Sequence, residues 1–208
     1  MIKNIIFDIG NVLAGFTWRD FFAGFGYGEE TIERLAAATV KDPMWNEIDR
    51  GAWSDKELLE GFIRNDPPLE KELGRVFENI HGIVVKYDYA IPWVLSLKEA
   101  GYRCYYLSNF SRKAHAECAD ALDFLKYMDG GILSYQDKLI KPDPKIYELL
   151  LDRFDLRAEE CVFMDDTKKN LLPAEQLGIH TILFLDREQA VTELKKLGVQ
   201  AQISGRRG

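Results

Sequence analysis

Polar side chains that could do chemistry follow three apolar runs of this sequence. Asp8 follows NIIF, Ser108 and Asn109 end the run YRCYYL, and Asp165 and Asp166 follow CVFM. Nearly continuous apolar runs are typical of strands buried on both faces of a parallel sheet. The carboxyl ends of such strands share one edge, where ligands bind. We therefore expect these five side chains to converge on one crevice.

Lys141 adds a positive charge, because it stands just before the turn PDP that opens a helix. Asp8 and Asp166 carry the hard oxygen ligands that Mg²⁺ prefers. The Ser108 hydroxyl can donate a hydrogen bond, and the amides at a helix N-terminus favour an anion. These groups together describe a phosphate site, in which Mg²⁺ would neutralise the phosphoryl group and Asp8 could attack phosphorus. An aspartyl-phosphate intermediate would follow.

Each of these motifs, taken alone, also has a structural explanation. An aspartate at a strand end is more often a turn or cap residue than a nucleophile. A Ser-Asn pair usually caps a helix, and the stretch DDTKKN, residues 165–170, could be a solvated loop. Four such motifs in this order at one sheet edge are harder to explain structurally, so we favour the functional interpretation.

The elements that must position these residues alternate along most of the chain. Apolar runs predict strands at residues 4–9, 102–108, 160–166 and 180–185, with a shorter one at 130–134. Helical patterns with capping residues cover residues 89–101, 111–122, 143–154 and 186–198. This alternation is typical of βαβ units with a parallel, right-handed sheet. We therefore predict an α/β fold.

One long region interrupts the alternation. From the first strand to about residue 85 the patterns are helical without a convincing strand, and the region is too long for an ordinary βα connection. We predict a core of residues 1–14 and 86–208, and a helical cap of residues 15–85 over the end of the first strand. The cap's aromatic residues are expected to pack between its helices, with one or two of them available to line a pocket: Trp18, Phe21, Phe22, Trp45, Trp53 and Phe62. Residues 204–208 resemble a frayed tail.

The amino-acid composition narrows the classes of molecule that this chain is expected to bind. The 208 residues include 47% hydrophobic and 29% charged residues, as in an ordinary globular protein. A net charge of −7 argues against nonspecific nucleic-acid binding, and no apolar run is long enough to span a bilayer. With no secretory signal and three cysteines in no metal-binding spacing, we expect a cytoplasmic protein with buried, reduced thiols. We expect a monomer or homodimer that binds a small phosphorylated metabolite, and no nucleic acid or membrane.

Four motifs, in this order, resemble those of the haloacid dehalogenase (HAD) superfamily: FDIGNVL, LSN, KPDPKIY and VFMDDTKKNLLPAEQLG. More narrowly, the chain is similar to the branch that has a helical cap after the first strand and a first motif F-D-x-G-N-V, which includes phosphatases acting on glucose 1-phosphate. The resemblance covers nearly the whole chain. It implies a Rossmann-like core, a Mg²⁺ cofactor and phosphomonoester hydrolysis.

The resemblance also implies roles for individual residues. Asp8 would be the nucleophile and a metal ligand, and the Gly10 carbonyl a further ligand. Asp166 would bind the metal directly, whereas Asp165 would support it through water.

At the substrate side, the resemblance implies that Ser108 and Asn109 hold the phosphoryl group. Lys141 would stabilise both Asp8 and the phosphoryl charge. Asn170 would order the loop that carries the acidic pair.

Gly10 stands where most phosphatases of this kind carry a second aspartate, which protonates the leaving oxygen and then activates water. General acid–base help of this sort is typically worth roughly 10²–10⁴-fold. One explanation is a substrate with a better leaving group, such as a sugar 1-phosphate or an acyl phosphate. Another is an acid from the cap, Glu47 or Asp49, although a solvated helix face is the interpretation that we favour for both.

Two alternatives come from other functional classes. A catalytically weak relative would bind a phosphorylated ligand or a protein partner without turnover. A metal-independent 2-haloacid dehalogenase would use the same aspartate to displace halide from carbon. The paired Asp165 and Asp166 argue against the dehalogenase, because adjacent like charges are costly without a cation to share.

Overall fold

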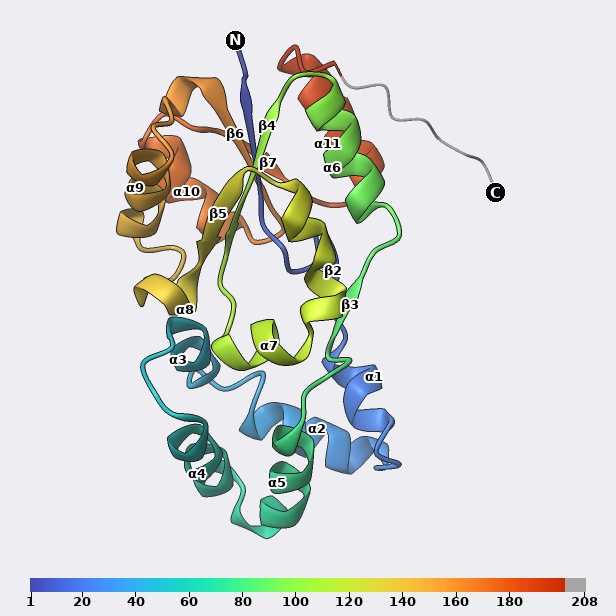
Figure 1. Ribbon diagram of the computed structural model, residues 1–208. Coiled ribbons are helices and arrows are strands. Elements are labelled where there is room, and N and C mark those ends of the chain that lie inside the picture. The colour runs from blue at the N-terminus through green and yellow to red at the C-terminus, as the bar shows by residue number, and fades with distance from the viewer. Residues whose placement is uncertain (201–208) are drawn as a thin grey trace.

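A five-stranded parallel sheet forms the centre of the computed structural model, which describes residues 1–200 (Figure 1). Its strand order is β5-β4-β1-β6-β7, and the bounds are Asn4–Phe7 for β1, Arg103–Ser108 for β4, Gly130–Leu133 for β5, Cys161–Asp165 for β6 and His180–Leu183 for β7. In register, Ile5 of β1 lies between Cys104 and Val162. The predicted α/β fold is confirmed, including the short strand near residue 130.

Helices cover both faces of the sheet. Figure 1 shows α6 (Ala90–Glu99) and α11 (Arg187–Lys196) on one side, and α9 (Pro144–Arg153) and α10 (Lys168–Gln176) on the other. Ile5 and Phe7 pack in one apolar cluster with Trp93 of α6, whereas Ile6 packs in a second cluster with Ile146 of α9. Successive side chains of a strand point to opposite faces, so an unbroken apolar run is what a doubly covered strand requires.

Capping side chains begin three core helices where the sequence predicts them. The side chains of Ser111, Asp143 and Asp186 accept hydrogen bonds from backbone N–H groups of the first turn. The helix predicted over 111–122 is nevertheless shorter: α7 covers Arg112–Glu117, and the 3-10 helix η2 continues over Ala119–Tyr127. The remaining short core elements are α8 (Ser134–Asp137) and the 3-10 helix η3 (Ala158–Glu160).

The insertion after β1 is largely helical, below the sheet in Figure 1. Its elements are α1 (Trp18–Ala23), α2 (Glu29–Ala38), α3 (Trp45–Arg50), α4 (Asp55–Asn65), the 3-10 helix η1 (Pro67–Leu69) and α5 (Glu70–Glu78). The expectation that this region lacks strands is wrong. Strands β2 (Ala14–Phe16) and β3 (Val84–Lys86) pair antiparallel at its two ends. Three residues are too few for an alternating pattern to identify a strand.

The aromatic residues of the insertion are buried to different extents, most of them in the same apolar cluster that includes Ile5 and Phe7 of β1. Phe22 and Phe62 are buried there, and Trp18, Phe21 and Trp45 are half-buried. Trp53 is 40% exposed, so the prediction that it packs between the cap helices is wrong.

Other predictions concern the cysteines, the membrane and the tail. The three cysteines are buried and unbridged, as predicted. Within residues 1–200, no helix combines the length and the apolar content that a bilayer crossing needs. The tail predicted at residues 204–208 lies outside the described residues.

Candidate active site

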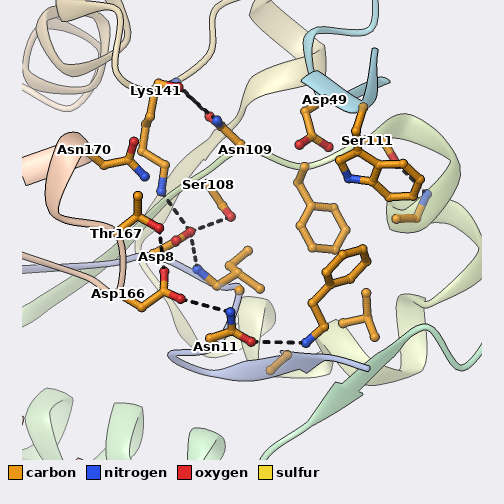
Figure 2. Close-up of a pocket in the computed structure, with 18 of the residues that line it drawn as sticks. Asp8, Asn11, Asp49, Ser108, Asn109, Ser111, Lys141, Asp166, Thr167 and Asn170 are labelled. Atoms are coloured by element: carbon orange, nitrogen blue, oxygen red, sulfur yellow. Dashed lines mark hydrogen bonds and ion pairs between the residues drawn. The ribbon is translucent and has the colours of Figure 1, made fainter. Parts of the chain in front are cut away.

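A cavity of about 290 Å³ opens at the carboxyl edge of the sheet, between the core and the cap. The core lines it with all but one of the sequence-predicted site residues: Asp8, Gly10, Ser108, Asn109, Lys141, Asp166 and Asn170. Only Asp165 lies behind its surface. Cap and linker residues close the other side with an apolar wall that includes Phe16, Trp45 and Val84. The strand ends thus bring the predicted residues together (Figure 2).

Asp8 is held at the end of β1 by donors that all reach one of its oxygens. Its Oδ1 accepts hydrogen bonds from the Ser108 hydroxyl and the Ile9 N–H, both at 2.7 Å, and pairs with Lys141 Nζ at 2.9 Å. Within residues 1–200, no hydrogen-bond donor reaches Oδ2, which leaves that oxygen available to a ligand. Burial raises the pKa of Asp8 to about 6, with a further rise from Asp165, against the lowering effects of Lys141 and Ser108.

Lys141 is a buried cation between two carboxylates. Its Nζ lies 2.6 Å from Asp165 Oδ2 and 2.9 Å from Asp8 Oδ1, and the residue is 3% exposed. Burial disfavours the charged ammonium, but the two carboxylates outweigh burial and raise the pKa of Lys141. The ammonium therefore stays charged at neutral pH.

Asn109 fixes the backbone of Lys141. Its Oδ1 accepts the Lys141 N–H at 2.7 Å, and its Nδ2 donates to the Lys141 carbonyl at 3.0 Å. Both ends of this side-chain amide are thus engaged by protein. The geometry gives the Asn109 side chain a positioning role, and leaves only its backbone for the phosphoryl contact that the resemblance implies.

Asp165 and Asp166 have different surroundings. Both oxygens of the fully buried Asp165 are bonded: Oδ1 accepts from the Thr167 N–H at 2.8 Å, Oδ2 pairs with Lys141, and Asn170 Nδ2 lies 3.1 Å from each. Asp166 lines the cavity and accepts from Asn11 Nδ2 at 2.9 Å. Asp166 is therefore the more accessible of the two to a bound ion.

These acids form a cluster that suits a hard cation. Carboxylate oxygens of Asp8, Asp165 and Asp166 lie within 4.8 Å of one another, and among the described residues one buried ammonium, that of Lys141, pairs with them. The buried Oδ1 of Asn170 also has no donor within residues 1–200. Oxygen donors with excess negative charge fit Mg²⁺. Gly10 lines the same cavity, and a Cβ built there would have no atom within 4 Å, so no steric constraint requires glycine.

Some site residues were missing from the sequence prediction. Asn11, at φ 56°, holds Asp166, and the Tyr147 hydroxyl donates to the Asn170 carbonyl at 2.6 Å. Asn11 lies within the FDIGNVL motif and could have been proposed from it. Tyr147 lies about one turn into a helical pattern, where nothing in the sequence distinguishes it from a core residue.

The two acids of α3 that the sequence analysis considered, Glu47 and Asp49, have different surroundings in the structure. Glu47 pairs with Arg50 at 3.4 Å and does not line the cavity, as expected of a solvated helix face. Asp49 lines the cavity, so that interpretation is wrong for Asp49. The two positions are two residues apart, and residues at that spacing do not share a helix face.

Residues 2–178 match the family of haloacid dehalogenase-like hydrolases, and the chain belongs to this family. It is 39% identical over 190 residues to a phosphorylated carbohydrates phosphatase of Thermotoga maritima. The matched stretch covers 87% of this chain and 84% of that protein. A HAD family enzyme of Bacteroides thetaiotaomicron, solved in complex with magnesium and inorganic phosphate, shares the fold. Its TM-score is 0.65 at 23% identity, over 88% of this chain and 93% of that chain.

The chain also matches longer proteins, of which it spans a small part. It is 27% identical to acyl-CoA dehydrogenase family member 10 of Mus musculus, over 94% of this chain but 19% of that protein. The shared region is therefore the hydrolase-like unit and not the whole relative.

Proposed function

We propose that this chain is a Mg²⁺-dependent phosphomonoester hydrolase that works through an aspartyl-phosphate at Asp8. The observation that carries the proposal is the environment of Asp8. One carboxylate oxygen is held by Ser108, Ile9 and Lys141, and the other lacks a donor within residues 1–200. This arrangement orients a carboxylate for attack by the second oxygen.

Asp8, Asp166 and the Gly10 carbonyl would hold the metal, with Asp165 acting through water. Bound Mg²⁺ would offset the charge of the phosphoryl group, so that an anionic nucleophile can approach it. Lys141 places a fixed positive charge beside Asp8, and Ser108 offers a hydroxyl at the same edge. Asp165 and Asn109 orient Lys141 by its ammonium and its backbone, respectively.

The substrate class that we propose is a small phosphorylated metabolite, such as a sugar phosphate. The relative in Thermotoga maritima, named as a phosphatase of phosphorylated carbohydrates, supports this proposal. The cavity supports it as well, because its polar end holds Asp8 and Lys141 while its apolar wall offers Trp45 and Phe16 to the organic part.

The deciding experiment is phosphate release from a panel of sugar phosphates, nucleotides and acyl phosphates, each with Mg²⁺ and with a chelator. We expect release that depends on Mg²⁺ and is fastest for a sugar phosphate. Binding of Mg²⁺ and phosphate without turnover would point to an inactive relative. Metal-independent halide release from 2-haloacids would identify a dehalogenase instead.

Mg²⁺ should also stabilise the folded chain, because the folded state assembles the carboxylates that the unfolded state separates. At about one hundred times the dissociation constant, the gain is roughly 2.7 kcal/mol. For a chain of this length, each kcal/mol raises Tm by about 2–4 °C. Thermal unfolding should therefore show the shift in the wild type and a much smaller one in Asp166→Asn. Asp152→Asn, an exposed acid on α9, is the matched control; an equal shift in all three proteins would exclude the proposed ligand set.

A further inference from the structure

Asp49 projects from the cap into the cavity that contains the proposed nucleophile. It lies in the last turn of α3, and Figure 2 shows it on the opposite side of the view from Asp8 and Lys141, with Ser108 between them. The core approaches the substrate from the strand ends, so a group on the cap faces the part of the substrate that leaves.

The core holds the Asp49 backbone in place. The Asp49 carbonyl accepts a hydrogen bond from the Ser134 hydroxyl at 2.5 Å, and Ser134 Oγ in turn accepts the Phe110 N–H at 2.9 Å. Gly51, at φ 66°, ends α3 against α8, where a Cβ would lie 3.0 Å from Tyr135. This end of the cap therefore packs directly on the core, and its packing fixes where Asp49 points.

The Asp49 side chain has no ion pair or hydrogen bond within residues 1–200, unlike Asp165 and Asp166. Burial raises its pKa to about 7, with a further rise from the charge of Asp8, against Lys141. A carboxyl group with this pKa is available in both protonation states near neutral pH, as a general acid and base requires. The other charged groups on α3 or lining the cavity are Asp8, Lys141, Asp166 and Lys169, and Glu47 and Arg50 of α3 itself.

We propose that Asp49 is the general acid and base of this site, in place of the aspartate absent at Gly10. This inference rests on the proposed phosphatase function. When Asp8 attacks phosphorus, the bond from phosphorus to the ester oxygen breaks, and the Asp49 carboxyl gives its proton to that oxygen, which leaves as an alcohol. The Asp49 carboxylate then accepts a proton from a water whose oxygen attacks the aspartyl-phosphate. The bond from phosphorus to Asp8 breaks and phosphate leaves. Asp8 is then again a free carboxylate, and Asp49 is again protonated.

The test compares Asp49→Asn with Glu47→Gln, the neighbouring acid that lies outside the cavity. On the alkyl phosphate that the wild type hydrolyses fastest, Asp49→Asn should lose roughly 10²–10⁴-fold in kcat, the usual worth of general acid–base help. Glu47→Gln should match the wild type. With p-nitrophenyl phosphate, whose leaving group needs no proton, Asp49→Asn should still release a burst of nitrophenolate. Phosphorylated Asp8 should then accumulate and be detectable by mass spectrometry.

A second variant separates a chemical role from a structural one. The space around Gly10 is open, so Gly10→Asp should restore the acid at the other position and recover at least tenfold of the rate lost in Asp49→Asn. Wild-type turnover of the alkyl phosphate by Asp49→Asn, or loss of the burst in a folded Asp49→Asn protein, overturns this inference and leaves the phosphatase proposal standing. A wild type that never phosphorylates Asp8 overturns the proposed function itself.

Discussion

Asp8→Asn is expected to abolish phosphate release without unfolding the protein. Asparagine has the same shape, and its side-chain oxygen can still accept from Ser108 and the Ile9 N–H. A neutral amide cannot serve as the nucleophile, so the covalent route is lost. Removing the nucleophile of a serine protease costs on the order of 10⁶-fold in kcat, and we expect a loss of that order.

The measurement is phosphate release at saturating substrate and Mg²⁺, together with the mass of the protein after brief exposure to substrate. Thermal unfolding without Mg²⁺ supplies the control, and we expect a change in Tm of a few degrees at most. The pKa of Asp8 is raised by burial, so its charge is costly in the folded state, and its removal offsets the lost ion pair with Lys141. Turnover above a tenth of the wild-type rate in Asp8→Asn would rule out Asp8 as the nucleophile.

Lys141→Met is expected to have the largest effect on stability. Methionine keeps the length and the apolar stem of the side chain but leaves Asp8 and Asp165 as buried carboxylates without their cation. Removing one partner of a buried ion pair typically costs about 3–5 kcal/mol. At about 2–4 °C per kcal/mol, Tm should fall by roughly 10 °C, and phosphate release should be lost with it.

This loss of stability should depend on pH in a definite direction. The folded-state pKa of Asp8 is about 6 with Lys141 present, and it is higher without the lysine, whose charge lowers it. At pH 5 the folded variant binds a proton at Asp8 that the unfolded chain binds more weakly, and this uptake stabilises the fold. The stability lost by Lys141→Met should therefore be greater at pH 8 than at pH 5.

Urea unfolding at both pH values, with a chelator present, measures the difference. Lys169→Met is the matched control for stability, because Lys169 lines the same cavity, is exposed and forms no ion pair within residues 1–200. Equal losses for the two lysine variants, or a larger loss at pH 5, would contradict the proposed role of the buried ammonium.

The sequence predicted the core and the polar edge well, because both depend on local patterns. The runs before Asp8, Ser108 and Asp165 are almost entirely apolar, which is typical of strands that are covered on both faces. Parallel strands then bring their ends together without further information. Lys141 could be included in the predicted site because it directly precedes a proline-containing turn that begins a helix.

The features that the sequence did not predict have a different physical cause. They depend on contacts between residues that are distant in sequence. Strands β2 and β3 are three residues each, and they exist because they pair with one another across the whole insertion. The direction of Asp49 depends on how α3 packs against Ser134 and Tyr135. A six-residue helix has too few turns to reveal its buried face by periodicity. The pairing of Asn109 with the Lys141 backbone likewise joins two loops that are 32 residues apart.

The β2–β3 ribbon has a consequence for how such a chain can diversify. Phe16 and Val84 lie opposite one another, so the inserted segment leaves and rejoins the core at neighbouring points. A segment with adjacent ends can be exchanged for another of different length while the sheet keeps its register. In this chain the exchange would replace Trp45 and Asp49 together, and leave Asp8, Lys141 and Asp165 in place. A single recombination event at this ribbon would therefore change both which substrates bind and how readily their leaving group departs.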